Sequence, residues 1–258
     1  MAKFIGIAGD FMKEKAFKHR VNALVVFFMA FVTTVFVIGW ASGYFWGHRS
    51  MWSVLFLLAA VGVAIPYFKF LEKTFYKHIR ASRKEEKGAD GESDFVKHLK
   101  DLPDTYTVVC DLDFADSYGN IDHLVIGPTG VFAIDVKDWK GSVASDGKGE
   151  LMLNGRPTDK PQVRYFTRRT MELKDRIKAL TKLDPYVQSV FAFLHTHVEA
   201  KWGTTGAVHC ISADQIVDYV TKARAKNPLP PADIPRLVAA ANALKELVQK
   251  PASSPSNS

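Results

Sequence analysis

Two long stretches of the chain carry no charged side chain, and both lie in its first 70 residues. Residues 21–47 and residues 51–68 contain no Asp, Glu, Lys or Arg. A helix rises about 1.5 Å per residue, so about 20 apolar residues cross roughly 30 Å of hydrocarbon. Residues 21–40 reach that length, and residues 51–68 lie at the shorter end of the range. The pattern predicts a hairpin of two transmembrane helices over residues 21–68.

Two other interpretations of these stretches are less favoured. A cleaved signal peptide has a shorter apolar core and is not followed by a second apolar stretch. A buried helical hairpin in a soluble domain is the other alternative, but charge-free runs of this length are rare in soluble cores. The spanning interpretation makes the lipid bilayer a partner of this chain.

The basic residues that flank the apolar stretches predict their orientation. Residues 1–20 hold five Lys and Arg, residues 69–90 hold seven, and the connection 41–50 holds only Arg49. Short cytoplasmic segments are enriched in Lys and Arg. We therefore expect a multi-pass protein of the cell inner (plasma) membrane, with the basic N-terminus (1–20) and the C-terminus both in the cytoplasm.

The net charge of +7 does not by itself indicate nucleic-acid binding. The excess lies in the membrane flanks, because residues 91–258 carry 21 basic and 21 acidic side chains. Two cysteines, Cys110 and Cys210, are too few for a disulfide framework, and both lie in apolar runs. They are interpreted as buried free thiols.

After the second apolar stretch, the chain alternates between helical and strand-like patterns. Residues 69–90 are rich in charge and predict a linker, whereas residues 91–250 predict an α/β domain. Within it, apolar residues at helical spacing are expected near 95–102, 161–180 and 234–248. Strand patterns cover residues 105–114, 121–127, 130–139, 149–155, 189–195 and 206–212, and residues 251–258 predict a disordered tail.

Two acidic residues interrupt the most apolar strands of this domain. Asp122 and Asp135 lie in runs that are otherwise apolar on both faces, where a carboxylate is costly unless something compensates it. Pro128 excludes the primed two-residue turns that need positive φ at that position. A loop over 127–130 built on a type I turn pairs Ile126 with Val131, and this register sets Asp122 opposite Asp135.

Opposed carboxylates on a buried sheet repel each other, so a bound cation is a natural compensation. Lys137 projects from the same face as Asp135 because side chains alternate along a strand. A three-residue loop with a bulge at Gly130 is the alternative, and it places Asp122 opposite Val136. The turn sequence alone does not choose between the two registers.

The segments GESDFVKHL, NIDHLVIGPTGVF and IDVKDWKG resemble the nuclease-related domain (NERD) of the PD-(D/E)xK nuclease superfamily. The resemblance extends over residues 91–180 and is densest over residues 119–141. It implies a restriction-endonuclease-like fold, in which a mixed central sheet is flanked by helices. The family more often carries Glu at the position of Asp135.

By this resemblance, Asp122 and Asp135 bind Mg²⁺ (or Mn²⁺), and the carbonyl of Val136 is a further ligand. Lys137 then orients or activates the attacking water and stabilises the transition state. Glu92 and Gln162 complete the implied catalytic set. For Glu92 the alternative is a solvated carboxylate in a first helical turn, and for Gln162 a polar residue at a helix start. Arg164 and Arg168 are candidates for phosphate contacts or for a solvated helix face.

Three functions remain open at this point. The preferred one is a membrane-anchored, metal-dependent nuclease that hydrolyses phosphodiester bonds of DNA or RNA on the cytoplasmic side. The second is a catalytically inactive module of the same fold that binds nucleic acid or a protein partner at the membrane. The third is a small assembly factor of the membrane whose hairpin carries the function.

Overall fold

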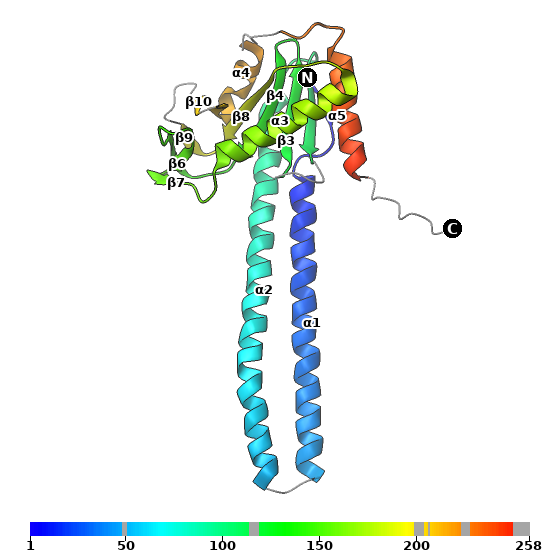
Figure 1. The fold of residues 1–258 in the computed structure, drawn as a ribbon, viewed down its shortest axis with the longest axis vertical. Helices are drawn as coiled ribbons and strands as arrows, with labels where there is room; N and C mark the ends of the chain where they lie inside the picture. The colour runs from blue at the N-terminus through cyan, green and yellow to red at the C-terminus, as the bar shows by residue number, and fades with distance from the viewer. Residues whose placement is uncertain (48–50, 114–118, 199–203, 206, 223–227, 250–258) are drawn as a thin grey trace, which may run out of the picture. The chain divides into compact units, whose positions relative to one another are not determined.

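The computed structural model describes residues 1–47, 51–113, 119–198, 204–205, 207–222 and 228–249. The chain forms two compact units, one from residues 1–11 and 88–258 and the other from residues 12–87. The first unit contains the α/β domain, and the second consists of two long helical segments (Figure 1). The predicted tail, residues 251–258, lies outside the described residues.

A mixed sheet forms the centre of the α/β domain. In the described residues its strand order is β1-β2-β3-β4-β8-β11-β10. Strands β2, β3 and β4 pair antiparallel, whereas β1 pairs parallel with β2 and β8 pairs parallel with both β4 and β11. The bounds are β1 Lys3–Ile5, β2 Thr107–Leu112, β3 Ile121–Gly127, β4 Gly130–Lys137, β8 Val187–Phe193, β10 Thr204–Thr205 and β11 Val208–Ser212.

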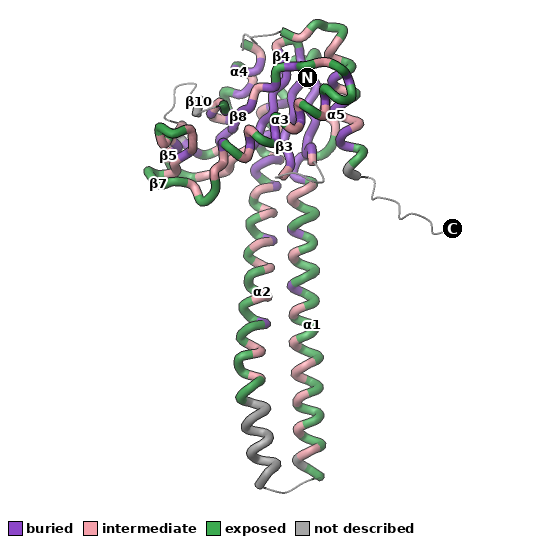
Figure 2. Tube along the Cα trace, in the orientation of Figure 1, coloured by how far each residue is buried: buried purple, intermediate pink, exposed green. Residues whose placement is uncertain are grey.

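The central strands are buried on both faces, as their continuous apolar runs predict. One face packs against α3 (Gln162–Thr181) and α5 (Ile234–Gln249), whose side chains Phe166, Leu173 and Leu237 enter its core. The other face packs against the end of α2 (Met51–Leu99), through Phe95 and Leu99, and against α4 (Ile216–Lys222), which follows the short 3₁₀ helix η1 (Ala213–Gln215). Figure 2 shows this burial concentrated in the sheet. The mixed sheet flanked by helices confirms the α/β architecture that was expected for this part of the chain.

A second, small sheet lies beside the central one. Its order is β7-β6-β5-β9, from β5 Gly141–Ser145, β6 Leu151–Leu153, β7 Arg156–Pro157 and β9 Thr196–Val198. Strand β5 follows β4 directly and β9 follows β8, so two central strands continue into this sheet. The stretch of the chain between β7 and β8 forms α3.

The second unit consists of α1 (Asp10–Gly47) from Met12 onward and α2 up to Lys87. The two helices contact each other through the rings of Phe27 and Phe75, whose centroids are 6.4 Å apart, and through Thr33 and Tyr67. The charge-free stretch of α1 therefore extends further along the helix pair than that of α2. Phe27 lies inside the first stretch, whereas Phe75 lies beyond the end of the second.

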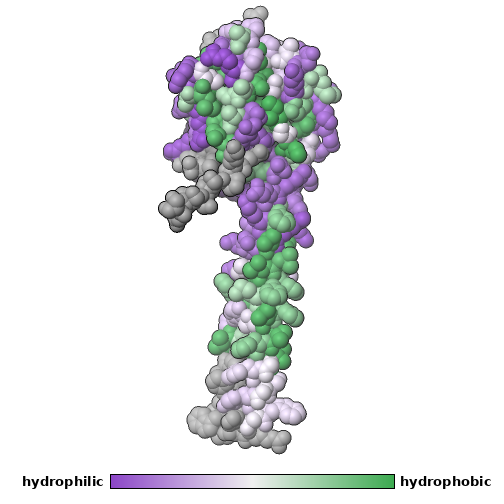
Figure 3. Space-filling view, turned by 90° about the vertical axis from the view of Figure 1, so that its right-hand side faces the viewer, coloured by the Kyte–Doolittle hydropathy of each residue, from purple (hydrophilic) through white to green (hydrophobic). Residues whose placement is uncertain are grey.

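Among the described residues, one helix is long and apolar enough to cross a membrane. It covers residues 10–44, and only 6% of its most hydrophobic window is buried. A helix in the core of a soluble domain is buried, so the exposure of α1 argues against that interpretation. Figure 3 shows the hydrophobic surface that the long helices present. The side chains of residues 51–61 lie outside the description, and these residues make up most of the second predicted span.

The segment predicted as a charged linker, residues 69–90, is helical in the structure. These residues belong to α2, which continues without a break from Met51 to Leu99. Their Lys, Arg and Glu residues are good helix formers, and Arg20 of α1 forms an ion pair with Glu86 of α2. High charge therefore marks an exposed helix here and not an irregular connection.

Candidate active site

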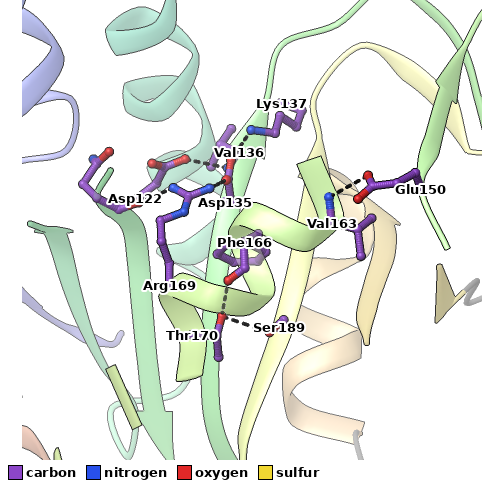
Figure 4. Close-up of polar contacts among 11 residues, drawn as sticks. Asp122, Asp135, Val136, Lys137, Glu150, Val163, Phe166, Arg169, Thr170 and Ser189 are labelled. Atoms are coloured by element: carbon purple, nitrogen blue, oxygen red, sulfur yellow. Dashed lines mark hydrogen bonds and ion pairs between the residues drawn. The ribbon is translucent and has the colours of Figure 1, made fainter. Parts of the chain in front are cut away.

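The hairpin of β3 and β4 adopts the first of the two expected registers. Ile126 pairs with Val131 and His123 with Ile134, so Asp122 lies opposite Asp135. The Asp122 carboxylate crosses to the neighbouring strand, where its Oδ2 accepts the N–H of Val136 at 2.7 Å. The alternative with a three-residue loop is thereby excluded. Both aspartate side chains lie on the same side of the sheet (Figure 4).

A third carboxylate continues this row onto β2. Cys110 pairs with His123 and Leu112 with Ile121, which leaves Asp111 at the level of Asp122. Asp111 has a φ of +52°. Its two neighbours on β2 pair with β3, but Asp111 itself does not. Burial raises the pKa of Asp111 despite hydrogen bonds from the backbone of Asp10 and Phe11. The sequence analysis missed this residue, although an acid inside the apolar run TVVCDL was a visible signal.

Asp135 is the most strongly paired of these acids. Lys137 Nζ lies 2.5 Å from its Oδ1, and Arg169 Nη2 lies 2.7 Å from its Oδ2. Burial alone would raise the pKa of Asp135, but the two cations outweigh it and hold this pKa below its usual value. Asp135 is therefore a carboxylate anion held between two cations, as Figure 4 shows.

Arg169, which the sequence analysis did not select, is placed by α3. Glu150 accepts the N–H groups of Val163 and Arg164 at 3.0 Å each, and so caps the first turn of that helix. From there α3 brings Arg169 to Asp135 and to the carbonyl of Asn120. A signal was present: Arg169 follows Phe166 by three positions and precedes Leu173 by four, so a cation stands on the apolar face of α3.

Among the described residues, no ion pair joins Asp122 to a cation. Burial and the neighbouring charge of Asp135 raise its pKa to about 7, although Lys137 and the N–H of Val136 act in the opposite direction. A group with this pKa binds and releases protons near neutral pH. It is also a carboxylate that a nearby divalent cation stabilises in its ionised form.

Glu92 lies within the last turns of α2 and is only 3% exposed. The alternative of a solvated carboxylate in a first helical turn is therefore wrong. Its Oε2 is buried without a hydrogen-bond partner among the described residues. Burial, followed by the charges of Asp122, Asp111 and Asp135, raises the pKa of Glu92 to about 10. The structure thus brings Glu92 into the same electrostatic environment as the three aspartates.

Gln162 is the first residue of α3 and is half-buried. Among the described residues, no hydrogen bond links its side chain to Asp122 or Asp135; Arg169 is the residue of α3 that reaches them. Arg164 and Arg168 are exposed on the same helix. Val136, expected to offer its carbonyl to a metal, donates its N–H to Asp122.

The donor chemistry fits a hard divalent cation. Glu92 and Asp122 offer carboxylate oxygens, which Mg²⁺ and Mn²⁺ prefer, and the Oε2 of Glu92 is buried without a partner among the described residues. Both oxygens of Asp111 already accept hydrogen bonds, from Asp10 and Asn120. Both oxygens of Asp135 face Lys137 and Arg169. Within the described part of the chain, no three acidic, His or Cys side chains are arranged closely enough to hold a metal ion. Coordination of a metal ion at this site therefore requires some of these side chains to change rotamer.

Comparison with known protein families gives one match, which lies within this domain. Residues 87–194 match the family model of the nuclease-related domain (NERD), which confirms the expected resemblance. The matched region runs from the end of α2 to β8, and it contains Glu92, Asp122, Asp135, Lys137 and Arg169. The searches of curated proteins and of solved structures found no match.

Proposed function

We propose that this protein is a membrane-anchored, metal-dependent nuclease that hydrolyses phosphodiester bonds of nucleic acid on the cytoplasmic side of the inner membrane. The observation that carries the proposal is the row of Asp122 and Asp135 on one side of β3 and β4, with Lys137 2.5 Å from Asp135. The match of residues 87–194 to a nuclease-related family supports the same chemistry.

In this proposal Asp122 and Asp135 hold Mg²⁺ or Mn²⁺, with the carbonyl of Val136 as a further ligand. The bound cation supplies Lewis acidity at the phosphate. Lys137 orients the attacking water and stabilises charge on the phosphate oxygens, while Glu92 and Gln162 assist from α2 and α3. Arg169 holds Asp135 in place, since it reaches that carboxylate from α3 at 2.7 Å.

The decisive experiment is a cleavage assay on the full chain in detergent, with DNA and RNA substrates and added Mg²⁺ or Mn²⁺. We expect cleavage by the natural sequence and its loss in an Asp135→Ala, Lys137→Ala double variant. Asp218→Ala, Lys222→Ala is the matched control, because it removes an exposed Asp–Lys pair from α4. Equal cleavage by the site variant and this control would refute the proposal.

We further propose that α1 and the first part of α2 form a transmembrane hairpin. Its support is the charge-free stretch of each helix, the basic residues before the first stretch and after the second, and the exposure of apolar side chains along α1, among them Leu24, Phe28 and Phe36. Reporter fusions at both termini and at Arg49 test this topology. Both termini should report the cytoplasm and Arg49 the opposite side; a cytoplasmic Arg49 would contradict the hairpin.

One observation favours the second candidate, a non-catalytic module that binds nucleic acid or a protein. Asp135 already has a cation on each oxygen, so its charge is balanced without a metal. This candidate predicts that calorimetric titration with Mn²⁺ gives no heat of binding. Saturable Mn²⁺ binding that Asp122→Asn abolishes supports the nuclease instead.

A further inference from the structure

The residues that precede the apolar hairpin form the first strand of the α/β domain. Lys3, Phe4 and Ile5 pair parallel with Thr107, Val108 and Val109 of β2, and the N–H of Lys3 donates to the carbonyl of Tyr106 at 3.0 Å. Strand β1 thus covers the edge of a sheet whose next strand carries Asp111. An open edge offers unpaired backbone groups to other chains, so β1 also protects the domain.

The segment after β1 fits closely against the domain. Gly9 has a φ of +75°, and a β-carbon there would lie 2.9 Å from the carbonyl oxygen of Ala89. Only glycine satisfies both conditions without strain. Ala2 and Ala8 are buried in the core next to Phe95. Residues 1–11 consequently belong to the same compact unit as residues 88–258.

Asp111 joins this segment to the candidate site. Its Oδ2 accepts the N–H of Asp10 at 2.6 Å, and the N–H of Phe11 also donates to it. These are the first N–H groups of α1, which have no partner within that helix. The preceding residue, Gly9, donates its backbone N–H to Glu92. Glu92 therefore receives one of its hydrogen bonds from a segment that Asp111 anchors.

We propose that residues 1–11 are an integral part of the nuclease-related domain, and that Asp111 is a positioning residue that holds Gly9 against Glu92. The domain is then formed by the segment before the two long helices and the segment after them, and the two helices are an insertion within it. A fragment that starts after the hairpin lacks β1 and the N–H that Glu92 binds. The role given to Glu92 rests on the proposed function, whereas the placement of residues 1–11 does not.

The test uses the full chain in detergent and two pairs of variants. Asp111→Ala removes the acceptor for the first N–H groups of α1. Asp111→Asn keeps an acceptor and tolerates positive φ, and Asn caps helices as well as Asp does. Lys3→Pro removes the N–H that bonds Tyr106, while its control Lys3→Ala changes only an exposed side chain. Hydrogen exchange of residues 1–11, followed by mass spectrometry, reports the anchoring directly.

We expect Asp111→Ala and Lys3→Pro to speed the exchange of residues 1–11 by about tenfold, the size of effect that loss of a helix cap produces. Asp111→Asn and Lys3→Ala should stay near the natural sequence. In the cleavage assay, Asp111→Ala should lower kcat with little change in KM, because Asp111 acts through Glu92 and is buried away from the surface, and Asp111→Asn should restore most of the activity.

Unchanged exchange in both Asp111→Ala and Lys3→Pro would overturn the proposal. Faster exchange with unchanged kcat would overturn the positioning role of Asp111 alone. If the natural sequence cleaves no substrate, the proposed function fails, and the exchange data still decide whether residues 1–11 belong to the domain.

Discussion

Arg169 and Asp135 form a buried ion pair, with 2.7 Å between Nη2 and Oδ2, that joins α3 to β4. The same guanidinium donates to the carbonyl of Asn120 and lies over the ring of Phe166, 5.1 Å from its centroid. A single side chain thus fixes helix α3, the start of β3 and the central carboxylate of the site.

Arg169→Ala should destabilise the domain by about 3 kcal/mol, the lower end of the cost of breaking a buried pair, because Lys137 still neutralises Asp135. Urea unfolding in detergent measures the change. Arg164→Ala removes an exposed arginine from the same helix and should cost less than about 0.5 kcal/mol. Equal effects of the two substitutions would contradict the structural role of Arg169.

Glu92→Gln should stabilise the metal-free protein at alkaline pH. The pKa of Glu92 is raised from 4.5 to about 10 in the folded chain, mainly by burial. Its contribution to stability is therefore fully present below pH 4.5 and is lost as the pH rises toward 10. Gln carries no such charge, so the difference in melting temperature between Glu92→Gln and the natural sequence should grow between pH 5 and pH 9.

Glu14→Gln is the matched control for that experiment, because Glu14 is exposed on α1 and forms an ion pair with the exposed Lys18. Its melting temperature should follow that of the natural sequence across the same range. A constant difference for Glu92→Gln at all pH values would show that Glu92 is ionised in the folded chain.

His123→Leu should raise the free energy of unfolding by about 1 kcal/mol at pH 7. The imidazole is fully buried beside Phe95, and both ring nitrogens lack a hydrogen-bond partner among the described residues. Removing such a group avoids its desolvation cost. Burial also lowers the pKa of His123 to about 3, so the folded chain loses stability as the pH falls from 6.5 toward 3.

Unfolding of His123→Leu at low pH gives a second measurement on the same variant. His123→Leu should unfold at a lower pH than the natural sequence, since it removes a group that binds a proton mainly in the unfolded chain. Destabilisation by this substitution at both pH 7 and pH 4 would indicate that the imidazole has a partner in the folded protein.

Gly127→Ala should destabilise the hairpin of β3 and β4 by about 2 kcal/mol, because the added methyl group overlaps the ring of Tyr106. Thermal unfolding measures this loss. The same substitution should cost less in a Tyr106→Ala background, where the ring is absent. Additive losses in that double-mutant cycle would contradict the close contact.

The sequence by itself determined the strands of the site and limited their register to two possibilities, between which the structure chose. Apolar runs without a helical period predicted β3 and β4, and Pro128 limited the turn between them. Asp122 and Asp135 are brought together by this one local hairpin, so the choice of turn decided their pairing. The apolar helix α1 is equally local, since its length and composition do not depend on the rest of the chain.

Only the tertiary structure decided which groups surround these aspartates. Arg169 reaches Asp135 across 34 positions, and Asp10 reaches Asp111 across 101. Such contacts depend on how α3 packs on the sheet and on where the chain returns after the long helices. A pattern of apolar and polar positions shows which face of an element is buried, but not which distant element covers it. The partners of Asp135, the buried position of Glu92 and the pairing of β1 with β2 therefore required the folded chain.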